Sequence, residues 1–373
     1  MQTDTSEPAL LYLSKLPPSP SGIGLYADEF VAALRAAHVN VEVYAAPPDP
    51  LATQRWRQAV VGFRLGRCWG VGPKPLHIEL SGRALFEFYA GLGFLTRANH
   101  PNLSLTCHDA PSVAGAVLLF RFLDRRGLRR VGLGLSQRVG PWLTRRVVSQ
   151  ADAVFALTAE GARELAVNYR RPITHLPHVV PQREPHQKEP AVFLPGYLGS
   201  PAASTALARV ILAVAPLNWT VRIGACSDEV RAELGREPRV TFTGFLDESA
   251  LLSEFDRASL VVRERPTEEG ANSLAASGPL SWAVAAHCHC ITNDQRAGAR
   301  ELADLGLVHL TNDVSASVRA YFADPPDPSW TPPDTAVARE SLSAAAVAAC
   351  FLRSIGPDAP NGRPSNGLAP RRN

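Results

Sequence analysis

Two glycines near the N-terminus stand between an apolar run and a helical pattern. The segment Pro17-Pro18-Ser19-Pro20-Ser21-Gly22-Ile23-Gly24 follows the apolar residues 9–13 and precedes the amphipathic residues 25–37. This order predicts a strand, a glycine-bearing loop and a helix start. A helix N-terminus presents unpaired N–H groups and a positive dipole end, which favour phosphate. Gly22 and Gly24 are therefore candidates to approach a phosphate-bearing ligand; the alternative is an ordinary glycine-rich helix start.

The spacing of these glycines argues against a nicotinamide cofactor. In a dinucleotide-binding Gly-x-Gly-x-x-Gly motif, the first glycine follows the strand directly. Here prolines and serines intervene, and Ala27 stands where the third glycine belongs.

A second candidate site ends a predicted strand at Thr106-Cys107-His108-Asp109. Folds of the α/β class place active residues at such strand ends. His108 can exchange a proton near neutral pH or hydrogen-bond a sugar hydroxyl, and Asp109 would orient it or neutralise a developing positive charge. The alternative is a histidine satisfied by the following turn, with Asp109 capping a helix.

A charged segment follows a predicted strand in the second half of the chain. Arg263 and Arg265 suit a diphosphate, because guanidinium groups make forked, charge-assisted hydrogen bonds. Glu268 and Glu269 follow, and Ser277-Gly278 begins a helix with a second anion-competent N-terminus. The alternative is a solvated charge cluster.

We predict no metal site at His287-Cys288-His289-Cys290, although its residue types suggest one. The alternation is that of a strand, so the two histidines face one way and the two cysteines the other. Zinc ligands are usually spaced further apart.

Residues 115–147 are strongly basic, with Asp124 as the single acid. A basic stretch with interleaved apolar residues can lie on an anionic membrane surface or hold an anionic acceptor. The alternative is a set of solvated surface helices. The arginines are Arg121, Arg125, Arg126, Arg129, Arg130, Arg138, Arg145 and Arg146.

Apolar runs alternate with amphipathic stretches along the whole chain, which predicts α/β architecture with parallel sheets. Strands are predicted at 9–14, 41–45, 76–80, 104–108, 153–157, 173–176, 191–194, 220–224, 240–243, 259–263, 288–292 and 307–310. The proline-rich residues 181–190 read as a linker between a first domain, 1–180, and a second, 191–325. A helix is predicted at 335–355, followed by a disordered tail at 356–373.

The composition agrees with an ordinary protein of two domains. The chain has 373 residues, 46% hydrophobic and 20% charged. A net charge of +3 is too small to indicate a nucleic-acid binder. Six cysteines without framework spacing, and no evident signal peptide, predict a cytoplasmic protein, peripheral on the membrane if the basic stretch binds it.

Taken in order, these segments resemble the GT-B glycosyltransferases of the retaining group 1 type, over roughly residues 9–322. P-P-S-P-S-G-I-G-L-Y-A-D-E-F resembles the opening loop and helix of that family, and L-T-C-H-D its His-Asp strand end. A-D-A-V-F-A-L-T-A-E-G-A-R-E-L and H-L-P-H-V-V-P are similar to the segments that lead out of the first domain. V-R-I-G-A, R-V-T-F-T-G-F-L and G-A-R-E-L-A follow in the family's order.

The resemblance implies two Rossmann-like doubly wound domains facing a central cleft. It implies a hexosyltransferase-like enzyme that moves a sugar, with retention, from a nucleotide-diphosphate sugar to a glycan, lipid or small-molecule acceptor. It implies no metal and no cofactor, because arginines and helix N-termini stabilise the leaving diphosphate. His108 and Asp109 would be catalytic. The donor residues carried over are Gly22, Gly24, Arg263, Arg265, Glu268, Glu269, Ser277 and Gly278.

The sequence departs from the family pattern in the second domain. Trp282 stands where the second of two glutamates belongs, and an insertion separates Glu269 from Ser277-Gly278. The segment 196–200 lacks the usual Arg/Lys pair, which would leave the phosphates to Arg263, Arg265 or Arg222. These departures keep two alternatives open: a catalytically degenerate scaffold or partner protein, and a sugar-nucleotide epimerase.

Overall fold

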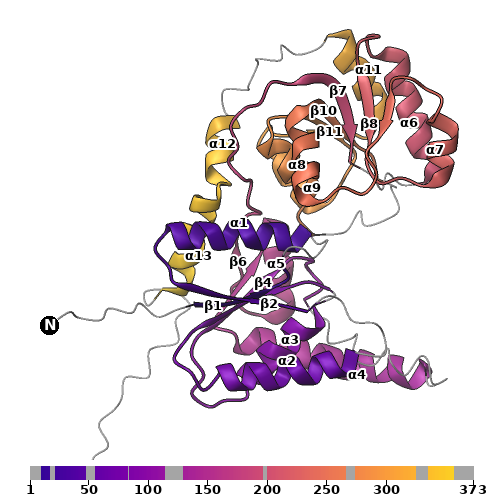
Figure 1. The fold of residues 1–373 in the computed structure, drawn as a ribbon. Coiled ribbons are helices and arrows are strands. Elements are labelled where there is room, and N and C mark those ends of the chain that lie inside the picture. Colours follow the sequence, from indigo (N-terminus) through magenta and orange to yellow (C-terminus); the bar gives the residue numbers. More distant parts are fainter. Residues whose placement is uncertain are drawn as a thin grey trace, which may run out of the picture. The chain divides into compact units, whose positions relative to one another are not determined.

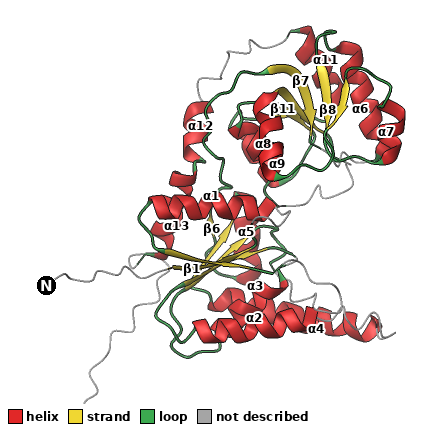
Figure 2. Cartoon of the chain, in the orientation of Figure 1, coloured by secondary structure: helices red, strands yellow, loops and turns green. Residues whose placement is uncertain are grey.

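The computed structural model describes residues 10–16, 22–47, 55–82, 84–113, 129–195, 200–265, 274–324 and 335–356. The chain divides into two compact units. Unit 1 comprises Met1–Pro177 and Ala344–Asn373, and unit 2 comprises His178–Ser343. In each unit, strands form a central sheet between layers of helices (Figure 2).

Unit 1 contains a six-stranded sheet in the order β2-β1-β3-β4-β5-β6, with every pair of neighbours parallel. The order reverses between β1 and β3, so the carboxyl ends of these strands flank a topological switch point. All six predicted strands are confirmed. They are β1 (Leu10–Ser14), β2 (Val41–Ala45), β3 (Leu76–Leu80), β4 (Leu103–Cys107), β5 (Ala153–Ala156) and β6 (Thr174–His175).

Helices cover both faces of this sheet (Figure 1). Helices α1 (Gly22–Ala36) and α13 (Ala344–Ile355) lie on one face, and α3 (Leu85–Phe94), with α2 (Arg55–Trp69) and α4 (Arg129–Gln150), lies on the other. Helix α5 (Ala159–Tyr169) connects β5 to β6. The C-terminal helix belongs to the core of unit 1, because its Phe351 ring lies 5.2 Å from Phe30 and 5.2 Å from Phe155.

Unit 2 contains a second six-stranded parallel sheet, in the order β12-β11-β10-β7-β8-β9. This is the order of a Rossmann fold, and its switch point lies between β7 and β10. All six strands were predicted. They are β7 (Glu189–Leu194), β8 (Thr220–Ile223), β9 (Val240–Phe242), β10 (Ala258–Arg263), β11 (His289–Thr292) and β12 (His309–Leu310).

The helices of unit 2 also form two layers. Helices α6, α7 and α11 cover one face of the sheet, and α8 and α9 the other (Figure 1). The helices are α6 (Pro201–Val214), α7 (Asp228–Leu234), α8 (Glu248–Arg257), α9 (Gly278–Ala285), α10 (Ala297–Asp304), α11 (Val314–Ala323) and α12 (Thr335–Ser341).

The first glycine segment differs from its prediction. Gly22 and Gly24 lie in the first turn of α1, and not in a loop before it. Tyr26, Ala27 and Phe30 are buried one turn further on, and this packing outweighs the poor helix propensity of glycine. The residues 17–21 lie outside the described part of the chain.

The C-terminal region also differs. The predicted helix 335–355 is two helices, with α12 in unit 2 and α13 in unit 1. The predicted tail, 356–373, lies outside the described residues except for Gly356.

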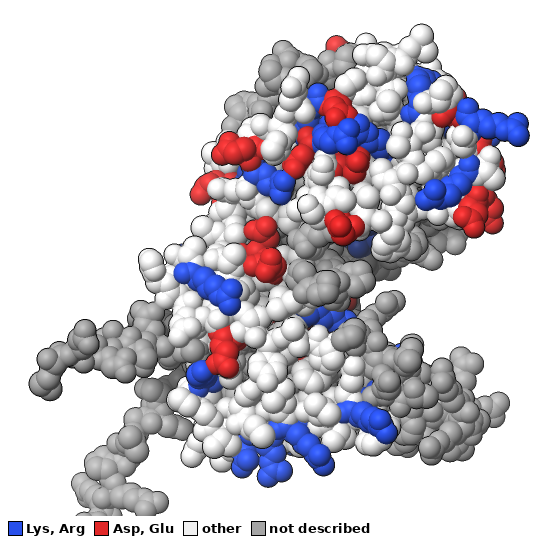
Figure 3. Space-filling model, viewed as in Figure 1, with Lys and Arg blue, Asp and Glu red and all other residues white. Residues whose placement is uncertain are grey.

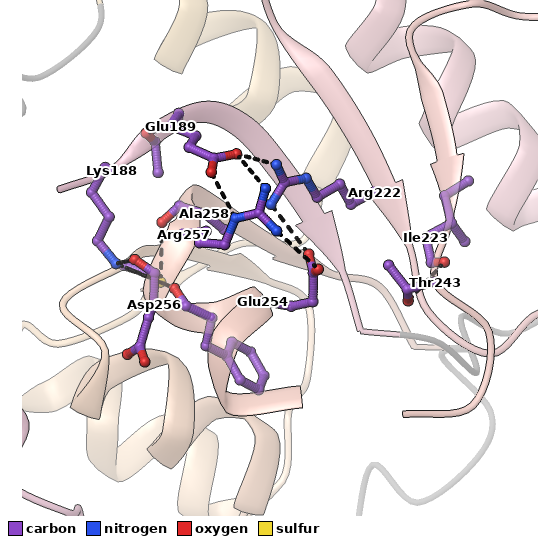
Figure 4. Close-up of polar contacts among 12 residues, drawn as sticks. Lys188, Glu189, Arg222, Ile223, Thr243, Glu254, Asp256, Arg257 and Ala258 are labelled. Atoms are coloured by element: carbon purple, nitrogen blue, oxygen red, sulfur yellow. Dashed lines mark hydrogen bonds and ion pairs between the residues drawn. The ribbon is translucent and has the colours of Figure 1, made fainter. Parts of the chain in front are cut away.

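The predicted linker is built into unit 2. Lys188 Nζ donates hydrogen bonds to the carbonyls of Phe255 (3.2 Å), Asp256 (3.0 Å) and Ala286 (2.5 Å), at the ends of α8 and α9 (Figure 4). Helix C-termini leave carbonyls that a cation satisfies well. Arg183 Nε adds a hydrogen bond of 3.1 Å to the Asp256 carboxylate. The polar side chains of residues 181–190, which predicted a linker, therefore bind this segment to the ends of α8 and α9.

Helix α2 packs unusually closely on α3 through glycines. A Cβ atom built on Gly66 would lie 1.8 Å from the Ala90 carbonyl oxygen, and one on Gly93 would lie 2.0 Å from that of Phe63. Only glycine permits these approaches. Helix α3 lies between the sheet and α2, and basic side chains gather over α2 at the lower edge of Figure 3.

Replacing Gly66 tests this packing. Gly66→Ala should lower the free energy of unfolding by about 1–3 kcal/mol, because the methyl group collides with backbone that must move. Urea unfolding monitored by circular dichroism measures the change. Gly278→Ala is the matched control, since its Cβ would meet nothing within 4 Å. Equal stability of the two variants would contradict the close packing.

Candidate functional site

The carboxyl edge of the unit 1 sheet carries a buried carboxylate. Glu79 lies near the end of β3, next to the switch point, and is 2% exposed. His108 follows β4 and is 7% exposed. His108 Nε2 lies 2.6 Å from Glu79 Oε2, so the predicted histidine belongs to a histidine–carboxylate pair.

The second oxygen of Glu79 is also occupied. Tyr12 donates its hydroxyl proton to Glu79 Oε1 at 2.6 Å, and His77 Nε2 lies 3.0 Å from the same atom. His77 Nδ1 lies 2.8 Å from Ser104 Oγ. Side chains from β1, β3 and β4 therefore hold one carboxylate from several sides.

These contacts fix the charge and the tautomer. Burial alone would raise the pKa of the Glu79 carboxyl, but hydrogen bonds and charge from His108 and His77 lower it from 4.5 to about 2. An ionised carboxylate only accepts hydrogen bonds, so His108 Nε2 must carry a proton. Nδ1 is then the nitrogen of His108 that can take up or release a proton.

Asp109 does not orient His108. Its carboxylate accepts a hydrogen bond of 2.9 Å from the Gly82 N–H and so ties the turn after β4 to the turn after β3. Glu79, and not Asp109, is the carboxylate that orients His108. Asp109 is exposed at the same edge and remains available to a ligand.

Aromatic rings hold the histidines in place. The Tyr26 ring of α1 meets His108 edge to face at 5.1 Å, and Phe351 of α13 meets His77 at 4.8 Å. Because Tyr26 lies one turn after Gly22 and two residues after Gly24, its contact with His108 brings the first turns of α1 to the sheet edge that carries His108. This places the glycine and histidine predictions at one edge.

A second cluster lies at the carboxyl edge of the unit 2 sheet. Arg263 ends β10, and its Nη1 donates a hydrogen bond of 2.7 Å to Ser277 Oγ. Ser277 occupies the N-cap position of α9 but makes no side-chain cap. The structure thus joins Arg263 to Ser277 and Gly278, as the sequence predicted them to share a site.

Asp294 is the anion at the centre of this cluster. It is 1% exposed and accepts hydrogen bonds from Arg296 Nε (2.8 Å) and Nη2 (2.6 Å), while Arg263 Nη1 lies 3.7 Å away. Burial, then the charge of Arg296, lowers the pKa of the Arg263 guanidinium to about 10. Two arginines share one carboxylate here, so the described residues of the cluster carry a net positive charge that favours an anion.

The remaining predicted donor residues divide into two groups. Arg265 lies beside the cluster, where its backbone N–H donates to Asn293 Oδ1 at 2.7 Å and Asn293 Nδ2 donates back to the Arg265 carbonyl at 3.0 Å. Glu268 and Glu269 lie outside the described residues, and so does most of the segment 196–200.

Glycine also shapes this edge. A Cβ atom on Gly298, in the first turn of α10, would lie 2.6 Å from the Ala276 Cα and 3.0 Å from the Ser277 backbone nitrogen. The glycine of the G-A-R-E-L-A segment therefore lets α10 approach the backbone that carries Ser277.

Arg222 is not part of the cluster. It forms ion pairs with Glu189, at the start of β7, and with Glu254 at 3.3 Å, while Arg257 Nε donates to Glu189 at 2.6 Å (Figure 4). Because Glu189 begins its strand, this network points toward the opposite edge of the sheet. Glu189 and Glu254 already neutralise Arg222, which makes it a weaker candidate for a phosphate than Arg263.

Cysteine and histidine residues form no metal centre among the described residues. Cys288 Sγ donates to the Phe255 carbonyl at 3.0 Å. His287 Nδ1 lies 2.6 Å from Arg339 Nη1 and its Nε2 lies 3.0 Å from the Arg183 carbonyl. His287 therefore connects the linker and α12 to the start of β11.

Much of the basic stretch 115–147 lies outside the described residues, which resume at Arg129 with α4. In α4, Trp142 is 59% exposed, and the Arg146 guanidinium lies 5.9 Å from its ring. No described helix combines the length and apolar character needed to cross a bilayer.

Sequence reasoning missed the partners of the predicted residues. Tyr12, His77 and Glu79 were assigned only to strands, and Asp294 and Arg296 only to the segment after β11. The available signal was ionisable residues at positions 77 and 79 of an otherwise apolar strand, which places both on one face. Asp294 and Arg296 show a similar spacing directly after a buried strand.

The comparisons with known proteins begin with the first domain. Residues 21–181 match the family model described as a glycosyl transferase 4-like domain. Among curated protein sequences, none matches the chain significantly.

Solved structures match nearly the whole chain. A structure from Listeria monocytogenes described as a UDP-N-acetylglucosamine 2-epimerase has a TM-score of 0.60 at 11% identity, covering 94% of this chain and 96% of that one. The lipopolysaccharide outer core galactosyltransferase WaaB, in its apo form, has a TM-score of 0.56 at 12% identity, and the match covers 93% of this chain and 99% of that one. S. aureus MnaA, solved with UDP, has a TM-score of 0.55 at 9% identity, and the match covers 94% of this chain and 96% of that one.

Two doubly wound parallel sheets, each with its charged cluster at the carboxyl edge, define a protein of the GT-B fold. Within that class, the first half of the chain matches the glycosyl transferase 4-like domain model over residues 21–181.

Glu79 gives the site a testable pH dependence. Because its folded pKa lies below 4.5, the ionised carboxylate stabilises the fold above pH 4.5, and this contribution is lost as pH falls toward about 2. Glu79→Gln should lower the free energy of unfolding at pH 7 by an amount on the order of 3 kcal/mol, and by less at pH 3.

Urea unfolding of both proteins at the two pH values measures the difference. Glu42→Gln, which removes an exposed ion pair with Lys74, should change little at either pH. A Glu79→Gln deficit that stays the same at pH 3 would show that the carboxylate is not ionised in the fold.

Proposed function

We propose that this protein transfers a sugar from a nucleotide-diphosphate sugar to a hydroxyl acceptor. The observation that carries the proposal is the combination of a glycosyl transferase 4-like domain with a second Rossmann-like unit whose carboxyl edge holds two arginines around one buried carboxylate. An excess of positive charge at a strand end and a helix N-terminus suits a diphosphate.

Unit 2 would bind the donor. Arg263 would contact the diphosphate together with the N-terminus of α9, and Asp294 would hold Arg263 and Arg296 in position. The UDP bound in the S. aureus MnaA structure supports a nucleotide ligand for this fold. Glu268 and Glu269 are proposed to contact the donor sugar, and this proposal rests only on the sequence resemblance to GT-B glycosyltransferases.

Unit 1 would bind the acceptor and supply His108. In the transfer, the bond from the sugar C1 to the diphosphate oxygen breaks, and the diphosphate leaves with the electron pair. A bond from C1 to the acceptor oxygen forms, and the acceptor proton leaves. His108 Nδ1 would accept that proton or hold a sugar hydroxyl, and Glu79 would stabilise the resulting imidazolium. The resemblance favours retention at C1.

An epimerase is the second candidate, favoured by the structural similarity to the Listeria protein and by the histidine–carboxylate pair. Incubation with a donor and no acceptor separates the two. An epimerase converts the donor to its epimer, whereas a transferase releases free sugar and nucleoside diphosphate slowly by transfer to water.

Donor binding is the first test. We expect one or more nucleotide sugars in a panel to raise the melting temperature, and Arg263→Gln to weaken that binding about 10- to 100-fold by removing charge-assisted hydrogen bonds. Titration calorimetry measures the affinity. Arg222→Gln is the control, because it removes an arginine that pairs with Glu189 and Glu254 and should leave affinity unchanged.

No response to any nucleotide or nucleotide sugar would exclude the transferase and favour the degenerate scaffold, which the missing glutamate and Arg/Lys pair also suggest.

Catalysis is the second test. His108→Ala should reduce donor hydrolysis about 100-fold or more while donor affinity is retained. Product release followed by chromatography measures the rate. Asp109→Asn should retain much more activity, since Asp109 contacts the Gly82 N–H and not His108. A fully active His108→Ala variant would remove His108 from the site.

A further inference from the structure

The outer face of α2 carries the reverse of the usual surface pattern. A surface helix ordinarily buries its large apolar residues and exposes its polar ones. In α2 the buried residues are Ala59, Gly62 and Gly66. Trp56 is 48% exposed and Val61 is 54% exposed.

This reversal follows from the glycine packing. Gly62 and Gly66 bring α2 against the backbone of α3, so no space remains between the helices for large side chains. Helix α3 in turn contacts the sheet, and it is buried along nearly its whole length. Trp56, Val60 and Val61, on the opposite side of α2, are therefore exposed, whereas Phe63, Leu65 and Trp69 are partly buried.

The exposed residues of α2 share one face. At 3.6 residues per turn, all of them fall on one side of the helix, opposite Gly62 and Gly66. Those residues are Trp56, Arg57, Val60, Val61, Arg64, Arg67 and Cys68. We call this set the α2 outer face.

The charge of this face has one sign. Its three arginines are exposed, and α2 contains no acidic residue. The Arg57 guanidinium lies 5.6 Å from the Trp56 ring, so a cation and an indole form one unit. In Figure 3 the blue side chains at the lower edge, over α2, have no red side chain among them.

We propose that the α2 outer face docks this protein on a membrane surface that contains anionic lipids. Trp56, Val60 and Val61 would enter the headgroup boundary, and Arg57, Arg64 and Arg67 would pair with lipid phosphates. A two-fold contact with a second copy would instead bring arginines against arginines, which is unfavourable. The charge pattern therefore selects the anionic lipid surface.

A second pair supports this choice. Trp142 and Arg146 of α4 repeat the exposed combination of indole and guanidinium, and α4 also packs on α3. The sequence pointed to residues 115–147 for membrane contact; of that stretch only part is described, and the inference here is argued from α2. The inference does not depend on the proposed transfer reaction.

Vesicle binding by the full chain tests the proposal. We expect the protein to sediment with vesicles of phosphatidylcholine and phosphatidylglycerol, not with phosphatidylcholine alone, and to be released by salt. The triple variant Arg57→Gln/Arg64→Gln/Arg67→Gln should bind about 100-fold more weakly, from about fivefold for each arginine. Trp56→Ala/Val61→Ser should also bind more weakly, but with an unchanged salt dependence.

The matched control removes the same number of arginine charges from exposed positions outside the α2 outer face. Arg163, Arg236 and Arg319 are exposed on α5, after α7 and on α11, and Arg163→Gln/Arg236→Gln/Arg319→Gln should bind vesicles as the unaltered protein does. Circular dichroism and thermal unfolding confirm that each variant is folded.

Three results would overturn the proposal: no binding to anionic vesicles, equal loss in the two triple variants, or retention of full binding by the α2 triple variant. A dimer in sedimentation velocity that Trp56→Ala/Val61→Ser abolishes, without vesicle binding, would assign the face to a second copy and likewise overturn it.

Discussion

A carboxylate buried in a parallel sheet has to find its hydrogen-bond donors inside the protein, and Glu79 sets this requirement for unit 1. Tyr12 and His77 serve one oxygen and His108 the other. An ionised group without these donors would be very costly to bury. The requirement aligns β1, β3 and β4 at their carboxyl ends, and the rings of Tyr26 and Phe351 then close around the histidines. The contacts that stabilise this edge are therefore the same ones that orient His108.

In the Arg263 cluster of unit 2 the buried charges are mainly positive, and a buried carboxylate compensates part of them. Arg263 and Arg296 are largely buried, and Asp294 compensates only one positive charge. The remaining charge, beside an uncapped helix N-terminus, is a stable arrangement that still favours an anion. The Glu189 network, by contrast, balances Arg222 and Arg257 with Glu189 and Glu254 and has no such excess. This difference in charge balance is the reason the Arg263 cluster, and not the Glu189 network, is proposed to bind an anion.

Glycines decide what the surface of unit 1 offers. Gly62 and Gly66 draw α2 close to α3, and Trp56, Val60 and Val61 are exposed on the opposite side of α2, among arginines. The close packing of α2 on α3 thereby creates a basic and apolar face that is separate from the Glu79–His108 pair. The two features are independent, since one depends on strand ends and the other on a helix that packs mainly on α3 and meets the sheet through Trp69 and Tyr44 of β2.

The sequence alone determined the strands, the two-domain α/β organisation, and His108 and Arg263 as residues at strand ends. Hydrophobic periodicity and strand-end position are local properties, so they can be read from neighbouring residues. It could not determine the roles of Glu79, Asp294 or Arg222, because those depend on partners 29, 31 and 33 positions away. Periodicity likewise cannot say that α2 packs mainly on the helix α3. Only the tertiary structure decided which charges are balanced and which faces are exposed, because long-range contacts set both.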